Sequence, residues 1–229
     1  MGFLLQRMSP AMPPVNAREV LRYARAGNTP DSRVQSLLEE VRSDAQEILV
    51  PRVCYTIVPA VVQENRITLG KDDDLAVESH DLAKSLRGCP QALLFVATIG
   101  LEVDRLIALY GRLSPGKALL LQALGAERIE ALCDSFCHAI AQQLSPQGLS
   151  LRPRFSPGYG DLPLSFQTPL LTALDSWRQI GVSLNDSLLM SPSKSVSALA
   201  GITTRHCNEE PTRHTCGECA QHTTCPYAI

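Results

Sequence analysis

The sequence has no long hydrophobic run and no block of basic residues. Its most apolar stretches, Ala92–Ile99 and Ile48–Val62, are too short, or too often interrupted by proline and arginine, to cross a bilayer. Near the start of the chain only Phe3, Leu4 and Leu5 form an apolar patch, too little for the core of a signal peptide. The net charge is −2, whereas binding to a polynucleotide depends largely on basic residues that neutralise phosphates. We therefore expect a cytoplasmic protein that binds neither a membrane nor a nucleic acid.

Several cofactor-binding signatures are also missing. The hydroxyl-rich turn Ser191–Ser197 contains one lysine but lacks the GxxxxGK[ST] spacing of a P-loop. Ser191 and Lys194 have the spacing of a Ser-x-x-Lys motif, but the companion motifs of serine chemistry are absent. We find no glycine-rich strand–turn–helix of the kind that often holds a nucleotide cofactor. These absences argue against nucleoside triphosphate binding and against a common type of methyltransferase.

What is present is the pattern of one globular domain with an appendage. The 229 residues are 45% hydrophobic and 19% charged, which is ordinary for a globular protein. Residues 1–15 carry three prolines and predict a flexible arm, and Asn16 followed by Glu19 resembles a capping box. Periodicity predicts helices over about 16–26, 31–50, 79–86, 103–109 and 115–144, and one from 168 onward. Apolar and β-branched runs predict strands over 53–62, 66–69, 92–98, 182–184, 188–190 and 195–202. The helix from 168 is expected to turn four side chains inward: Leu170, Leu171, Leu174 and Trp177.

The helix over 115–144 is the longest and should anchor the core. Cys133 and Cys137 lie four residues apart on its apolar stripe, and we interpret them as small apolar filling rather than as a metal-ligand pair. The opposite face carries three carboxylates: Glu127, Glu130 and Asp134. Such a row is typical of a solvated face, but it also fits a carboxylate that faces a ligand cleft. Periodicity alone does not choose between these two.

The stretch RPRFSPGYGD, residues 152–161, predicts a shaped loop, because it places two prolines and two glycines within ten residues. Gly158 and Gly160 would let the backbone approach a ligand closely or adopt a positive φ. Tyr159 offers a flat ring with a polar tip, and Arg154 a fork for a carboxylate or phosphate. On composition alone, a structural turn with a surface arginine remains the simpler interpretation.

The last 23 residues contain half of the eight cysteines, arranged as Cys207-x8-Cys216-x2-Cys219-x5-Cys225. Four thiolates in so short and polar a segment could bind a tetrahedral zinc ion, which would also fold the segment. The same thiolates could instead bind an iron–sulfur cluster. Three histidines nearby are spare ligands, namely His206, His214 and His222. The remaining alternative is a redox-labile segment without metal.

Taken together, these pieces resemble the activation domain of cobalamin-dependent methionine synthase in its free-standing form. The resemblance covers about residues 17–202. It is carried by five segments: LAKSLRGC (82–89), LFVATIGLEVDRLI (94–107), RIEALCD (128–134), RFSPGYGD (154–161) and IGVSLNDSLLMSPSKSVSALAGI (180–202). It implies an α+β fold with a mainly antiparallel twisted sheet and packed helices over residues 16–203, followed by a Cys-rich tail at 204–229.

The resemblance also implies a binding site for S-adenosylmethionine. The Arg-x-x-Pro-Gly-Tyr motif that lines this site in the family is matched here by Arg154, Pro157, Gly158 and Tyr159. Ser156 falls where the adenosyl part of the ligand should meet the backbone. The helix glutamate of the family aligns best with Glu130, which would suit the ligand's ammonium or ribose hydroxyls, while Arg154 would suit its carboxylate. A pair of tyrosines near the end of the family's domain is replaced here by the cysteine tail.

The function implied by the resemblance is reactivation of a methionine synthase made as a separate polypeptide. The chain would bind S-adenosylmethionine and support the reductive methylation of cob(II)alamin, which also needs one electron from a donor. Because the chain lacks the Asp-x-His-x-x-Gly signature of a cobalamin-binding module, a corrinoid partner must supply the cobalamin. Two alternatives remain: a complete methyltransferase acting on a small molecule, and a regulatory or interaction module organised around a metal-binding tail.

Overall fold

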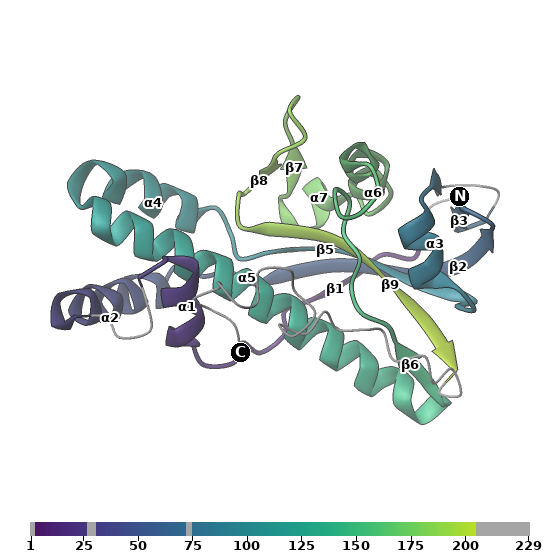
Figure 1. Cartoon of the computed structure of the whole chain (residues 1–229), viewed down its shortest axis with the longest axis horizontal. Helices are drawn as coiled ribbons and strands as arrows, with labels where there is room; N and C mark the ends of the chain where they lie inside the picture. The colour runs from purple at the N-terminus through teal and green to yellow at the C-terminus, as the bar shows by residue number, and fades with distance from the viewer. Residues whose placement is uncertain (1–2, 27–30, 72–74, 205–229) are drawn as a thin grey trace, which may run out of the picture.

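The centre of the protein is an antiparallel β-sheet (Figure 1). The computed structural model describes residues 3–26, 31–71 and 75–204. Within these residues the strand order is β4 (Leu75–Glu78), β3 (Arg66–Leu69), β2 (Arg52–Gln63), β5 (Gln91–Thr98), β9 (Ser195–Thr204) and β6 (Leu149–Leu151). A further strand, β1 (Gln6–Met8), pairs with the first part of β2. All these pairings are antiparallel, so the predicted sheet is confirmed.

Strand β5 lies in the middle of the sheet and is apolar almost throughout because both of its faces are covered. It pairs with β2 from Arg52↔Thr98 to Pro59↔Gln91, and with β9 from Gln91↔Ile202 to Thr98↔Ser195. Successive side chains of a strand point to opposite faces. Leu93 and Phe95 accordingly belong to one buried cluster, and Leu94 and Val96 to the other.

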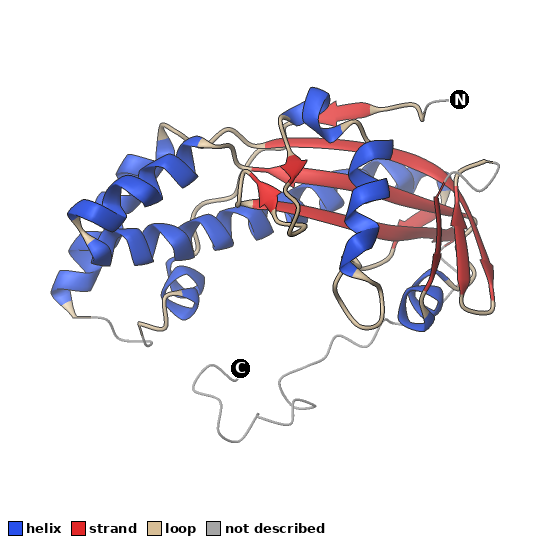
Figure 2. Cartoon of the chain, turned by 90° about the horizontal axis from the view of Figure 1, so that it is seen from above, coloured by secondary structure: helices blue, strands red, loops and turns tan. Residues whose placement is uncertain are grey.

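One face of the sheet is covered by the long helix α5 (Pro115–Leu144), with α1 (Ala17–Tyr23), α2 (Ser32–Gln46) and α4 (Glu102–Leu113) packed along it (Figures 1 and 2). Phe136 of α5 lies over the sheet, with its ring centroid 5.1 Å from Tyr55 and 5.0 Å from Phe95. Burying a side chain of this size contributes roughly 1.5–3 kcal/mol, so α5 anchors this layer as expected. Its end continues into a 3₁₀ turn, Ser145–Gln147, before β6.

The other face carries α3 (His80–Leu86), the 3₁₀ turn Leu164–Phe166, α6 (Gln167–Ala173), α7 (Ser176–Ile180) and the hairpin of β7 (Ser183–Leu184) and β8 (Met190–Ser191). The prediction that Trp177 points inward is wrong, because its side chain is 67% exposed. The expected helix is broken at Asp175, where φ is +44°, so α7 starts in a new orientation. Periodicity counted from Leu170 therefore does not extend to Trp177, and Ile180 is buried instead.

The helix starts follow the local capping signals. The side chain of Asn16 accepts a hydrogen bond from the Glu19 amide at 3.3 Å, and that of Asp31 accepts one from Val34 at 2.8 Å. Ser79 caps α3 in the same way, with Oγ 3.0 Å from the Leu82 amide. These side chains satisfy amides that have no partner within the helix.

The first residues, which their prolines predict to form a flexible arm, make hydrogen bonds to the sheet and to α5. Gln6–Met8 pairs with Val53–Tyr55 of β2, and the carbonyls of Pro13 and Pro14 accept hydrogen bonds from Arg128 of α5 at 2.7 and 3.2 Å. We call residues 12–16 the N-terminal strap, because this segment lies across α5. In the part of the chain that the structure describes, no helix is both long and apolar enough to cross a membrane.

Candidate functional site

Arg154 crosses from the edge of the sheet to α5 and meets two carboxylates. The next residue, Phe155, exchanges two backbone hydrogen bonds with Leu199 of β9, each 2.8 Å long, which fixes where the loop leaves the sheet. Arg154 Nη2 lies 3.2 Å from Oε2 of Glu130 and 2.6 Å from Oδ1 of Asp134. These carboxylates are four residues apart and therefore share one side of the helix. The structure thus brings Arg154 and Glu130 together, and adds Asp134, to which the family resemblance assigned no role.

The loop after Arg154 forms a compact turn. The Tyr159 amide donates to the carbonyl of Ser156 at 3.1 Å, and the Gly158 amide to that of Leu162 at 2.9 Å. Gly158 adopts a φ of +88°, which a residue with a side chain adopts only with strain. Pro157 is buried, whereas Tyr159 is 60% exposed and packs edge-on against Phe155, with 5.4 Å between ring centroids.

The far end of the loop is anchored to α3 by Asp161. Its carboxylate accepts hydrogen bonds from Ser79 Oγ, from the His80 amide at 2.6 Å and from the Asp81 amide at 3.1 Å. The hydrogen bond from Ser79, with those from the amides, lowers the pKa of Asp161. Gly160 has a φ of +55°, and a Cβ there would clash with Oδ2 of Asp81. The loop that carries Arg154 is therefore held at both ends. The sequence predicted a helix over 79–86 but gave no sign of the bond between Ser79 and Asp161.

A hollow of about 460 Å³ adjoins the two carboxylates of this cluster on the α1 side. The hollow is lined by Pro13, Pro14, Asn16, Glu19, Tyr23, Glu127, Glu130, Ala131, Asp134 and Ser135. The loop residues Ser156, Pro157, Gly158 and Tyr159 are not among them. The cluster of Arg154, Glu130 and Asp134 thus lies between the hollow and the loop. Of the six predicted ligand-binding residues, only Glu130 lines the hollow.

The third carboxylate of the row on α5 behaves differently from the other two. Glu127 is buried, so the three carboxylates do not form a uniformly solvated face. Its carboxylate is paired with the guanidinium of Arg128 and accepts a hydrogen bond from the Asn16 amide at 3.0 Å. The physical reason is the N-terminal strap, which covers this turn of α5 and excludes water from both side chains.

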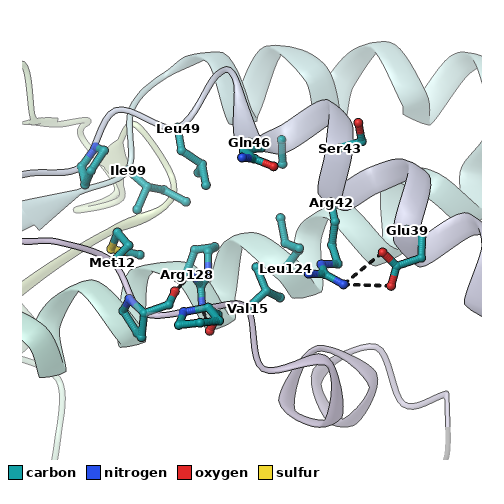
Figure 3. Close-up of a pocket in the computed structure, with 14 residues that line it drawn as sticks. Met12, Val15, Glu39, Arg42, Ser43, Gln46, Leu49, Ile99, Leu124 and Arg128 are labelled. Carbon is teal, nitrogen blue, oxygen red and sulfur yellow. Dashed lines mark hydrogen bonds and ion pairs between the residues drawn. The ribbon is translucent and has the colours of Figure 1, made fainter.

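A larger hollow, of about 660 Å³, lies between α2, α5 and the N-terminal strap (Figure 3). Its walls are mostly apolar, and at one end Arg42 is paired with Glu39 at 2.8 Å. Both hollows are lined by Pro13 and Pro14, so the strap is a wall common to them. None of the predicted ligand-binding residues lines the larger hollow.

With this geometry established, the chain can be compared with known proteins. Neither a family model nor a curated protein matches the sequence. A solved structure does resemble it: the MetH reactivation domain bound to AdoHcy, with a TM-score of 0.65 and 15% sequence identity over 87% of this chain and 78% of that one. The fold is that of the MetH reactivation domain. At this identity the likeness shows the fold alone, and it confirms the predicted α+β class.

Within this MetH reactivation fold, the cysteines that the structure describes are core residues. Burial raises the pKa of Cys133 to about 12 and that of Cys137 to about 11, so both thiols are protonated at neutral pH. Both belong to the apolar packing of α5, as predicted. Among residues 3–26, 31–71 and 75–204, no group of three or more histidine, cysteine or acidic side chains is arranged to hold a metal. The predicted ligands Cys207, Cys216, Cys219 and Cys225 lie outside these residues.

Proposed function

We propose that this chain binds S-adenosylmethionine and supports the reductive methylation of cob(II)alamin in a separate cobalamin-dependent methionine synthase or a related corrinoid protein. The fold supports the proposal, since the MetH reactivation domain of the same fold is bound to AdoHcy, the demethylated analogue of S-adenosylmethionine. The proposal is carried by the ion pair between Arg154, from the loop motif, and Glu130 on α5.

The described residues offer complementary groups for this ligand. A guanidinium binds a carboxylate through parallel hydrogen bonds, and the two contacts of Arg154 described above use Nη2, one of its three nitrogens. Glu130 would accept hydrogen bonds from the ligand's ammonium or ribose hydroxyls. Gly158, whose φ of +88° shapes the turn, would bring the loop backbone beside Ser156 and Tyr159 to the adenosyl part. Because Arg154 and Glu130 are paired with each other, ligand binding exchanges one set of ionic partners for another.

When bound, S-adenosylmethionine would supply a methyl group to the reduced cobalt of the partner's cobalamin and would leave as S-adenosylhomocysteine. The one electron that reduces the cobalt would come from a separate donor. The residues of this chain act by holding and orienting the ligand, which is a matter of proximity. No general base is required, because no proton is removed when the methyl group is transferred. The exposed side of the loop, with Tyr159, leaves room for the approach of a partner.

The proposal is tested by calorimetric titration of S-adenosylmethionine into the pure protein and two variants. We expect saturable binding by the wild type and binding at least about tenfold weaker by Arg154→Ala, because a charge-assisted pair is lost. Arg105→Ala is the matched control, since Arg105 forms an exposed ion pair with Glu102 on α4, 2.6 Å long, away from the loop. Absence of binding by the wild type would contradict the proposal.

For the tail we propose a metal site formed by Cys207, Cys216, Cys219 and Cys225, holding zinc or an iron–sulfur cluster. Support for this proposal comes from the spacing of the thiols alone. A cluster there could relay the activating electron to the cobalamin. Anaerobic purification, metal analysis, absorption and electron paramagnetic resonance distinguish the cases. A colourless zinc protein would exclude the electron relay, and a protein without metal would exclude the site.

A further inference from the structure

The charged groups around the smaller hollow fall into three clusters, of which two are balanced. Glu127 is paired with Arg128, and Glu19 is paired with Arg22 at 2.6 Å. In the third cluster two carboxylates, those of Glu130 and Asp134, share the single guanidinium of Arg154.

The third cluster therefore carries one surplus negative charge, which the removal of Asp134 would eliminate. Glu130 alone would neutralise Arg154. Asp134 lines the hollow, and its side chain is 72% exposed, so its charge faces the space beside the predicted ligand groups. The neighbouring polar side chain one turn further along α5, His138, is hydrogen-bonded to Gln142 at 2.9 Å.

The two ligands of the proposed reaction differ in charge but hardly in shape. S-adenosylmethionine carries a sulfonium, an ammonium and a carboxylate, and so has a net charge of +1 at neutral pH. Loss of the methyl group leaves S-adenosylhomocysteine, a neutral thioether with the same ammonium and carboxylate. A site with a surplus negative charge attracts the first ligand more strongly than the second.

We infer that Asp134 is a specificity-determining residue, which makes the site prefer the methyl donor over its demethylated product. This inference rests on the proposed function and goes beyond it. The transfer of the methyl group removes the positive charge that Asp134 attracts, so the reaction itself weakens the hold on the product. Because Asp134 is exposed, solvent screens its charge, and we expect its share of the preference to be about twofold to fivefold.

The test compares the affinities of both ligands for the wild type, Asp134→Asn and Asp175→Asn, by calorimetry on the full chain. Asp134→Asn keeps the size of the side chain and removes its charge. We expect it to lower the ratio of S-adenosylmethionine to S-adenosylhomocysteine affinity about twofold to fivefold. Both ligands carry the same carboxylate, so any change that the variant causes in the partners of Arg154 affects both affinities alike and cancels in the ratio. Raising the salt concentration should shrink the wild-type ratio towards that of the variant.

Asp175→Asn is the control, because Asp175 is a carboxylate at the start of α7, on the opposite face of the sheet. It should leave both affinities and their ratio unchanged. An unchanged ratio in Asp134→Asn, or an equal loss for both ligands, would overturn the inference while leaving the proposed function intact. If the wild type bound neither ligand, the proposed function would fail and the inference with it.

Discussion

Two charged clusters lie about one turn apart on α5, and they use the same residue types in opposite ways. Arg128 and Glu127 are buried, with 3% of the Arg128 side chain exposed, and both are also hydrogen-bonded to the strap backbone. Arg154, Glu130 and Asp134 form a more open cluster, with one cation for two carboxylates. The solvent exposure of a charged cluster therefore decides its role. The buried cluster, Arg128 and Glu127, holds the strap in place, and the exposed cluster around Arg154 is accessible to a ligand.

The first way to break this comparison is Arg128→Ala. It leaves Glu127 buried without its partner and removes the hydrogen bonds that hold Pro13 and Pro14. Breaking a buried ion pair in this way costs about 3–5 kcal/mol, so the free energy of unfolding should fall by that amount. Chemical denaturation measures it, with the exposed Arg105→Ala expected to stay within about 0.5 kcal/mol of wild type. A loss below about 1 kcal/mol for Arg128→Ala would show that the strap does not depend on this pair.

The second prediction concerns the rigidity of the loop that carries Arg154. Gly160→Ala should destabilise the protein by about 1–3 kcal/mol, because the new Cβ meets the Asp81 carboxylate and the backbone is in the left-handed region. Gly88→Ala is a matched control, since Gly88 has a φ of +73° but no other atom within 4 Å of the place that a Cβ would occupy. It therefore reports the backbone strain alone. Equal losses in the two variants would contradict the tight contact with α3.

Much of the fold could be predicted from local signals, but the environment of α5 could not. Asn16, Asp31 and Ser79 mark helix starts because a cap depends on residues only three apart. The polar strand β1 could not be predicted, because its pairing is specified by the free edge of β2 and by nothing in its own three residues.

The site shows the same division between local and distant causes. Glu127 resembles its neighbours in the row, and only a strap more than 100 residues away in sequence separates them. Glu130 and Arg154 could be paired beforehand only through the family resemblance, and the four-residue spacing of Asp134 was the available hint of its involvement.

The third prediction is that Arg154→Ala changes stability far less than Arg128→Ala. Its two carboxylate partners are substantially exposed, and ion pairs of this kind contribute about 1 kcal/mol or less. Chemical denaturation of the same preparation used for the binding experiment checks this. A loss comparable to that of Arg128→Ala would mean that both clusters are structural, and the comparison would fail.

The smallest expected effect is on the pH dependence of stability, through the carboxylate of Asp161. The pKa of Asp161 is lowered in the folded protein by its hydrogen bonds to Ser79 and to the amides of α3. Its contribution to stability is therefore fully present above its ordinary pKa, and is lost as the pH falls through the lower, folded value. In melting temperatures measured between about pH 6 and pH 2, Asp161→Asn should show a shallower decline than the wild type. Parallel curves would contradict the anchoring role of Asp161.

The exposed position of Trp177 has a spectroscopic consequence. It is the sole tryptophan of the chain, and its ring already faces water in the folded state. Its fluorescence emission should therefore lie close to that of the unfolded chain and report denaturation poorly. The same exposure makes it a sensitive probe of anything that docks over α7: a blue shift, or protection from acrylamide quenching, would reveal a bound partner without any added label.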